Sequence, residues 1–471
     1  MSLKRLRKTK QTGVNNMKMT VIGGGGVRSM FLARSIASRA HALGIKELVF
    51  MDNDEVKLDI FGKMAKKISS LIDASLKFSL TTDIFEAVKD ADYVITTIRV
   101  GGDSMRVRDE RIALNLGVLG QETTGAAGFS FAMRSIPALL SYCEIIKKFA
   151  KPDVKMFNFT NPAGLVSQVL SDKGYDFTYG ICDAPSGMLH SFADLLGVSA
   201  DRVYGDIYGL NHLSFFNSIT LDGKNVLEDI ICNDKAYSET DMRYFSKDML
   251  LERKFIPNEY LYYFFSREKA VANILSAEQT RGEQIEKINA LMIDELSHID
   301  VENDFDTALQ IFEKYYGMRE NSYMASETGV RRQKQWHFDP FAPDDGGYAG
   351  VALRFIDIVN SKKDGEMIFC TKNNGAIPGL YDDDIVEITC NVSKDAVTPK
   401  KFTEDSIDTY AMELIRRMKH YEREAAAAIL TKDKKRAAEA LALHPLVESY
   451  SIASKLIEEY IELNKDYSSG W

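Results

Sequence analysis

Four consecutive glycines, Gly23–Gly26, separate a short apolar run from a helical pattern near the start of the chain. The apolar run, Met17–Ile22, predicts a strand, and Met30–Ile36 predicts the start of a helix. A glycine turn between a strand and a helix lets the backbone approach a pyrophosphate, whose charge then lies at the helix N-terminus. The fingerprint is incomplete, because Arg28 takes the place of its third glycine, so the turn needs support from elsewhere in the sequence.

The next apolar run gives that support, because it ends in a carboxylate. Glu47–Met51 predicts a second strand, and Asp52 follows it. An Asp in that place accepts hydrogen bonds from the adenosine ribose and repels an added phosphate, which favours NAD over NADP. We therefore predict an NAD site formed by Gly23, Gly24, Gly25, Gly26, Val27 and Asp52.

Strand and helix patterns continue to alternate as far as residue 158, as in a doubly wound parallel sheet. Beyond His212 the pattern changes to longer helices and isolated strands, which puts a domain boundary near residue 205. The 471 residues therefore predict an α/β fold with two domains. A disordered lead (1–16) would precede a Rossmann-type domain (17–205), and a mostly helical α+β domain (206–471) would provide substrate and subunit contacts.

Charge and cysteine usage exclude several classes of protein. A net charge of -9 argues against a broad nucleic-acid surface, so an anionic ligand must be bound by particular arginines. The five cysteines are odd in number and lack CxxC spacing, which fits a reducing compartment. No apolar run is long enough to span a membrane, and no signal core follows the basic N-terminal residues. We expect a cytoplasmic protein that binds neither nucleic acid nor membrane.

Three polar clusters each follow or end a short apolar run that predicts a strand. These clusters are Asn158–Gly164, Gly180–Pro185 and Gly209–His212. Open α/β sheets bind their ligands at strand ends, so the clusters mark the expected site. The Cys182 thiolate, the His212 imidazole and the Asn161 amide would form an open metal position of mixed ligands. Each residue alone is more often a packing residue, and it is their combination that favours a site.

Arginines gather after another predicted strand, in the helical segment Met105–Arg111. Planar guanidinium groups suit a bidentate grip on phosphate or carboxylate. Arg106 lies near the strand end and is the candidate ligand, whereas Arg108 and Arg111 fit a solvated helix face. A basic, aromatic loop at 331–337 is a candidate lid or partner contact.

Motifs along nearly the whole chain from residue 17 resemble those of family 4 of the glycoside hydrolases, which depend on NAD and a metal and act mainly on phosphorylated disaccharides. They are Gly23–Gly26, Arg99–Gly102, Asp109–Arg111, Gly120–Thr123, Asn161–Ala163, Cys182, Gly209–His212, Asn373–Ala376 and His444–Val447. The resemblance implies a nucleotide domain of the lactate and malate dehydrogenase superfamily.

The resemblance also implies a reaction. Cys182 and His212 would hold a divalent metal, typically manganese, and Tyr260 would be the catalytic base, aided by the metal and nearby arginines. NAD would take a hydride from carbon 3 of the sugar, the metal would acidify the proton on carbon 2, and Tyr260 would remove that proton. Elimination, addition of water and return of the hydride would complete a cycle without net redox change.

The substrate residues follow from the same resemblance. Asn161 would contact sugar hydroxyls, and Arg106 and Arg281 are the candidates for the sugar 6-phosphate. Asp183 is typical of family members that cleave 6-phospho-α-glucosides, where it would be the leaving-group acid, yet other motifs, among them Thr160–Leu165, are similar to the β-acting branch. We expect a 6-phospho-β-glucosidase, with a 6-phospho-α-glucosidase as the alternative.

Two other classes remain open. A dehydrogenase of the lactate and malate type would share the nucleotide domain but would accumulate NADH and would need no metal cysteine. A nucleotide-sensing regulator would use Cys182, His212 and Tyr260 only for packing. Two long helical patterns at the C-terminus, 406–430 and 434–463, have alanine-rich faces that suggest packing on the core or a homodimer or homotetramer.

Overall fold

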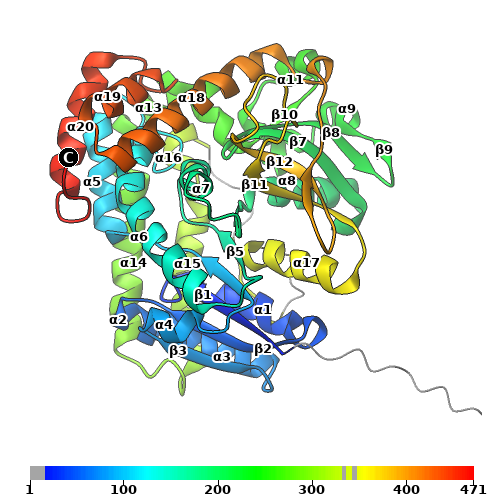
Figure 1. Cartoon of the computed structure of the whole chain (residues 1–471), viewed down its shortest axis with the longest axis vertical. Helices are drawn as coiled ribbons and strands as arrows, with labels where there is room; N and C mark the ends of the chain where they lie inside the picture. Colours follow the sequence, from blue (N-terminus) through cyan, green and yellow to red (C-terminus); the bar gives the residue numbers. More distant parts are fainter. Residues whose placement is uncertain (1–15, 331–335, 342–346) are drawn as a thin grey trace, which may run out of the picture.

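The computed structural model describes residues 16–330, 336–341 and 347–471 (Figure 1). Residues 1–15 of the predicted lead and residues 331–335 of the basic loop lie outside this range. None of the helices in the described ranges combines the length and the apolar character that crossing a membrane requires.

The first six strands form the parallel half of one large sheet. They are β1 (Met17–Ile22), β2 (Ile45–Met51), β3 (Lys77–Thr81), β4 (Tyr93–Thr96), β5 (Lys155–Asn158) and β6 (Thr178–Gly180). Their spatial order, β3-β2-β1-β4-β5-β6, reverses direction at β1 and is the order of a Rossmann fold. The predicted doubly wound sheet is confirmed, and its reversal point lies beside the glycine turn.

Helices connect these strands. They are α1 (Ser29–Leu43), α2 (Glu55–Lys57), η1 (Leu58–Gly62), α3 (Lys63–Ile72), α4 (Ile84–Val88), α5 (Gly102–Asn115), α6 (Ala127–Phe149), α7 (Ala163–Asp172) and α8 (Ala184–Leu196). Strands β1, β2, β4 and β5 are mostly buried, because helices cover a parallel sheet on both faces, whereas β3 and β6 are largely half-buried.

The sheet does not end at β6. Three strands from the C-terminal part continue it in antiparallel fashion: β11 (Gly365–Lys372), β12 (Ile385–Val392) and β13 (Val397–Pro399). We did not predict β11, because its apolar core, Met367–Cys370, is too short for its period to separate strand from helix. The C-terminal part therefore contributes to the same sheet as the nucleotide domain.

A second, smaller sheet contains β7 (Val203–Leu210), β8 (Leu213–Leu221), β9 (Lys224–Asn225) and β10 (Ile256–Pro257). Residue 205, where we placed the domain boundary, lies inside β7. Asn211 and His212 form the tight turn of the β7–β8 hairpin, and His212 has a φ of +62°. Figure 1 shows this sheet at the upper right, far from β1–β3 at the bottom.

The remaining helices surround the two sheets. They are η2 (Ala200–Arg202), α9 (Leu227–Cys232), α10 (Ala236–Glu239), η3 (Asp241–Tyr244), α11 (Lys247–Arg253), η4 (Glu259–Leu261), α12 (Tyr262–Phe265), α13 (Arg267–Ser276), α14 (Arg281–Ser297), α15 (Phe305–Asn321), α16 (Ala325–Thr328), α17 (Gly347–Ser361), η5 (Glu404–Ser406), α18 (Thr409–Thr431), α19 (Lys434–Leu443) and α20 (Tyr450–Asn464). Helices α18 and α20 pack on α5, α6 and α7 of the nucleotide domain, and α19 packs on α18 and α20 (Figure 1). Their apolar faces thus contact the core of their own chain, and the oligomeric state stays a prediction.

One buried ion pair joins these last helices to the site. Arg134 on α6 donates to Asp109 on α5 (Nη2 to Oδ2, 2.6 Å), and their side chains are 1% and 3% exposed. The same guanidinium donates to the Asn464 side chain on α20 (2.7 Å) and to the carbonyl of Val100 after β4 (3.1 Å). It therefore fixes the segment between β4 and α5 that reaches the candidate site.

We predict that Arg134→Ala lowers the free energy of unfolding by about 3–5 kcal/mol, because it leaves the Asp109 carboxylate buried and unpaired. Arg111→Ala is the matched control, on helix α5, which also carries Asp109. Arg111 pairs with Glu283 at 2.6 Å but is 41% exposed, so its loss should cost less than about 1 kcal/mol. Urea unfolding followed by circular dichroism measures both losses of free energy. Equal losses would contradict the stabilising role given to the buried Arg134–Asp109 pair.

Candidate active site

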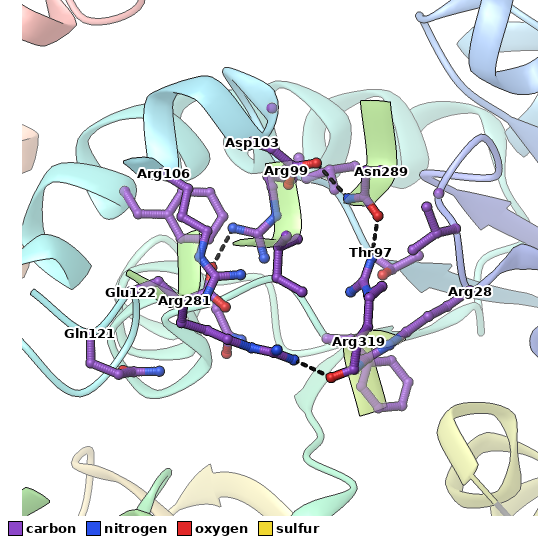
Figure 2. Close-up of a pocket in the computed structure, with 18 of the residues that line it drawn as sticks. Arg28, Thr97, Arg99, Asp103, Arg106, Gln121, Glu122, Arg281, Asn289 and Arg319 are labelled. Atoms are coloured by element: carbon purple, nitrogen blue, oxygen red, sulfur yellow. Dashed lines mark hydrogen bonds and ion pairs between the residues drawn. The ribbon is translucent and has the colours of Figure 1, made fainter. Parts of the chain in front are cut away.

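A cleft of about 900 Å³ lies at the carboxyl ends of the parallel strands, where doubly wound sheets bind their ligands. Helices α5, α14 and α15 supply arginines to its wall (Figure 2). Most predicted site residues line the cleft: Gly23, Gly25, Gly26, Val27, Asp52, Arg106, Asn161, Asp183, Tyr260 and Arg281. The predicted residues Gly24, Cys182 and His212 are not part of its wall.

The glycine turn leaves no room for side chains at its first two positions. Gly23 has a φ of +100°, and a Cβ on it would lie 2.4 Å from the carbonyl oxygen of Thr97. A Cβ on Gly24 would lie 2.5 Å from the Cβ of Phe50. Asp52 closes the turn, since its carboxylate accepts the Gly25 amide at 2.9 Å. Burial raises the pKa of this carboxyl. The turn thus keeps the close backbone approach that a pyrophosphate requires.

Two of the cleft arginines are neutralised by carboxylates. Arg106 donates to Glu110 (Nε to Oε1, 3.0 Å) and lies 3.5 Å from Glu122, which Arg99 also contacts. Although burial opposes it, the guanidinium groups of Arg106 and Arg99 hold the pKa of Glu122 down at about 2. Glu110 also accepts the backbone amide of Gly282 at 2.8 Å and so docks the start of α14 on α5. The charge of Arg106 is therefore balanced within the protein.

Two other arginines have only neutral partners (Figure 2). Arg281 donates to the Ser322 hydroxyl (2.7 Å) and to the backbone carbonyl of Arg319 (2.8 Å), and Arg319 donates to the amide oxygen of Asn289 (2.8 Å). The Arg319 Nε is buried without a hydrogen-bond partner among the described residues. Burial lowers the pKa of Arg319 to about 10. Within 16–330, 336–341 and 347–471, neither guanidinium forms an ion pair with a carboxylate, so the two favour a bound anion.

Sequence reasoning missed Arg319. It lies within α15, in a segment whose helical pattern gives no sign that this residue faces a cleft rather than solvent. Arg281, by contrast, is the first residue of α14, where Thr280 and Glu283 form a capping box that fixes the helix start.

The two candidate metal ligands come from different strands. Cys182 is half-buried between β6 and α8, and His212 is buried in the β7–β8 turn. Burial raises the pKa of the Cys182 thiol well above its usual range and lowers the pKa of His212 to about 3, so the imidazole is neutral. The His212 Nδ1 is buried without a hydrogen-bond partner among the described residues.

These properties fit a divalent metal with open coordination positions. A neutral imidazole is the form that binds metals, and a nearby cation would stabilise the thiolate that burial disfavours. No group of three or more His, Cys, Asp or Glu side chains arranged for a metal occurs in the described residues. Two protein ligands would therefore leave the remaining positions to other oxygen or nitrogen donors.

Tyr260 stacks directly on the candidate metal histidine. The rings of Tyr260 and His212 are 3.8 Å apart and tilted by 5°. Asn258 accepts the Tyr260 backbone amide at 3.1 Å, which caps η4, and the Tyr323 hydroxyl donates to the Tyr260 oxygen at 3.2 Å. Burial, and next the Glu259 carboxylate, raise the pKa of Tyr260 well above its usual range.

This environment differs from the prediction that arginines help Tyr260 to ionise. The charges that act most strongly on it come from the acidic side chains Glu259, Cys182 and Asp183 rather than from guanidinium groups. The phenolate would therefore depend on a cation brought into the site and on the Tyr323 hydroxyl.

Asp183 and Asn161 lie at the ends of two neighbouring strands. Asp183 follows β6 and precedes α8, and burial raises its pKa although the Arg28 guanidinium opposes this. A carboxyl with a raised pKa is suited to donate a proton. Asn161 follows β5, and its backbone carbonyl accepts the Ser135 hydroxyl at 3.3 Å. Both side chains belong to residues that line the cleft.

The chain is similar to known proteins over nearly its full length. It is 31% identical to a "Probable 6-phospho-beta-glucosidase" of Bacillus subtilis (strain 168), over 96% of this chain and 97% of that protein. It superposes with a TM-score of 0.79 and 29% identity on the 6-phospho-beta glucosidase from Thermotoga maritima, which was solved with manganese, NAD+ and glucose-6-phosphate. That match covers 96% of this chain and 99% of the other.

More distant structures share only the fold. A lactate dehydrogenase from a deep-sea metagenome library superposes with a TM-score of 0.50 and 13% identity. This match confirms the predicted fold class and says nothing about the activity.

A model of the family described as "Family 4 glycosyl hydrolase" matches residues 18–198, and the model of its C-terminal domain matches residues 207–447. The chain is therefore a member of glycosyl hydrolase family 4.

Proposed function

We propose that the protein is a 6-phospho-β-glucosidase that uses NAD and a divalent metal such as manganese. The observation that carries the proposal is the pair Arg281 and Arg319, two half-buried guanidinium groups without a carboxylate partner in the described part of the chain. A sugar 6-phosphate would supply the missing negative charge. Both relatives named above carry a 6-phospho-beta-glucosidase name, and the solved one binds glucose-6-phosphate.

Other predicted site residues fit the two cofactors. The tight turn at Gly23–Gly26 and the Asp52 carboxylate fit NAD, and Cys182 with His212 fits the metal. NAD would supply a reversible hydride acceptor, and the metal would supply a Lewis acid. The chain's own residues must then place the sugar and move its protons.

Tyr260 is our candidate for the base that removes the proton from carbon 2 of the sugar. It lines the cleft, stacks on His212, and accepts a hydrogen bond from Tyr323 that favours its phenolate form. Asp183 is our candidate for the acid that protonates the leaving oxygen, because burial favours its protonated form. Asn161 would hold sugar hydroxyls between them.

The phosphate role is assigned to Arg281 and Arg319 rather than to Arg106. Arg106 is already paired with Glu110 and Glu122, so a phosphate there would compete with two carboxylates. Arg281 and Arg319 are joined through the hydrogen bond from Arg281 to the Arg319 carbonyl, which places the two groups on one side of the cleft (Figure 2).

We predict that Arg281→Ala and Arg319→Ala each raise the KM for 6-phosphorylated substrates about 10- to 100-fold, the loss expected for one hydrogen bond to a charged group. Arg108→Ala is the matched control, since Arg108 is exposed on α5 and should have no effect. Steady-state kinetics with phosphorylated and unphosphorylated p-nitrophenyl glucosides separates the cases. An equal loss with unphosphorylated glucosides would argue against the phosphate role.

The proposal is tested by the release of p-nitrophenol from the α and β anomers of p-nitrophenyl glucoside 6-phosphate, with NAD and manganese supplied together or omitted singly. We expect turnover of the β anomer that needs both additions. Turnover of the α anomer alone would make the protein a 6-phospho-α-glucosidase, in line with Asp183. Failure of both anomers would overturn the proposal.

A further inference from the structure

A second cavity, with a volume of only about 20 Å³, adjoins the candidate metal histidine. The loop before α6, the start of α7, the β7–β8 turn and α18 enclose it. His212 lines this cavity, and its ring also stacks on Tyr260, which lines the large cleft. His212 therefore lies between the small cavity and Tyr260 of the large cleft.

Among the buried polar atoms on residues that line this cavity, the Oε2 of Glu422 lacks a hydrogen bond but forms an ion pair with Lys419, and four further atoms have neither kind of partner among the described residues. They are the hydroxyls of Thr123 and Thr124, the Oδ1 of Asn211 and the Nδ1 of His212. A buried polar group without a partner costs about 1–3 kcal/mol, so four around one small space require an explanation. A single water molecule needs a cavity of at least about 10–15 Å³ and forms 2–4 hydrogen bonds.

The orientation of the Asn211 side chain fits a water molecule in this cavity. Its Nδ2 donates to Oε1 of Glu387 at 3.1 Å, and the Ser214 hydroxyl donates to Oε2 of the same buried carboxylate at 2.7 Å. The amide nitrogen of Asn211 is thus held on Glu387, and its oxygen is left as an acceptor. Glu387 in this way fixes the residues on both sides of His212.

We infer that the small cavity binds one ordered water molecule that holds His212 in the tautomer required of a metal ligand. The water would accept hydrogen bonds from His212 Nδ1–H and one threonine hydroxyl, and would donate to Asn211 Oδ1 and the other hydroxyl. All four unpartnered atoms are then satisfied. With its proton on Nδ1, His212 keeps the lone pair of Nε2 free for a metal, as outer partners of metal histidines commonly ensure. The inference rests on the proposed metal role of His212.

The threonine and asparagine oxygens could also coordinate a monovalent cation. An N–H at His212 Nδ1 would repel the cation, so the cation would require the lone pair on Nδ1 and the proton on Nε2. A histidine that binds a metal through Nε2 cannot carry a proton on that atom. The two occupants therefore predict opposite tautomers of His212.

The test uses a double variant, Thr123→Val with Thr124→Val, which removes both hydroxyls at nearly constant volume. The control is Thr123→Ser with Thr124→Ser, which keeps them. We expect the Val variant to bind Mn²⁺ about 10- to 100-fold more weakly, the usual cost of losing outer partners of a metal ligand, while the Ser variant stays within about 3-fold of the wild type. Electron paramagnetic resonance of free Mn²⁺ measures the affinity, and NAD affinity should be equal in all three proteins. A Val variant with wild-type Mn²⁺ affinity would overturn the inference.

Two measurements on the unaltered protein keep the inference testable if the Val variant fails to fold. Nitrogen-15 chemical shifts of the seven histidines, with His212 assigned through His212→Asn, should show the Nδ1–H form of this residue in metal-free protein. A high-resolution crystal structure should show one water in the cavity. An empty cavity, or a cation with His212 as the Nε2–H form, would contradict the inference. If the protein bound no Mn²⁺ at all, the proposed function would fail, while the water and the tautomer would still be decided.

Discussion

Tyr260→Phe should reduce kcat on a 6-phospho-β-glucoside by about 10²–10⁴-fold, the contribution of a positioned general base. The change removes only the hydroxyl oxygen, so the stack on His212 and the packing of η4 should persist. NAD affinity should be unchanged, because within the described residues no hydrogen bond joins Tyr260 to the glycine turn or to Asp52. Kinetics with p-nitrophenyl 6-phospho-β-glucoside and a separate NAD titration measure the two effects.

Tyr323→Phe is the matched control for this prediction. Tyr323 donates to the Tyr260 oxygen at 3.2 Å, so its loss would weaken the phenolate without removing the base. We expect a reduction of at most about 10-fold, the value of one hydrogen bond. A Tyr260→Phe enzyme that keeps more activity than Tyr323→Phe would show that Tyr260 is not the base.

Cys182→Ser and His212→Asn should each abolish manganese binding at concentrations that saturate the wild type. Each removes one of two protein ligands, which should cost more than the about 10- to 100-fold typical of losing an outer partner. Asparagine is chosen at 212 because the φ of +62° lies in the left-handed region, which asparagine adopts more readily than alanine. Both variants should lose turnover and keep the fold.

Cys232→Ser is the control for the metal prediction, since Cys232 is an exposed cysteine at the end of α9. It should bind manganese and turn over substrate as the wild type does. Free Mn²⁺ measured by electron paramagnetic resonance reports the affinity, and thermal unfolding reports the fold. Wild-type affinity in either the Cys182 or the His212 variant would refute the proposed metal site.

The local pattern of the chain was enough to predict its nucleotide domain. Gly23 and Gly24 have to be glycine because the backbone of Thr97 and the side chain of Phe50 leave no space, and a turn of this kind can be recognised from adjacent residues. The alternation of strands and helices likewise encodes burial on both faces of a sheet. The three polar clusters at strand ends could be found in the same way, since a strand end is a local feature.

Other features were decided by packing between distant parts of the chain. The strands β11–β13 join the nucleotide sheet at β6, although no local pattern says which edge they will extend. Of the two carboxylate partners of Arg106, Glu110 lies four residues further along the same helix, whereas Glu122 was not predictable because it lies beyond the end of that helix.

The residues of the candidate site likewise divide into those that the local sequence predicts and those that only tertiary packing brings together. The sequence by itself placed Cys182, His212, Arg281 and Tyr260 among the candidates, because each lies in a recognisable motif. Only the tertiary structure brought Arg319 beside Arg281 without a carboxylate, and placed the Thr123 and Thr124 hydroxyls around one cavity with His212. The physical reason is that a motif determines which groups are available, whereas the charge balance and hydrogen bonding of a buried group depend on all the elements that enclose it.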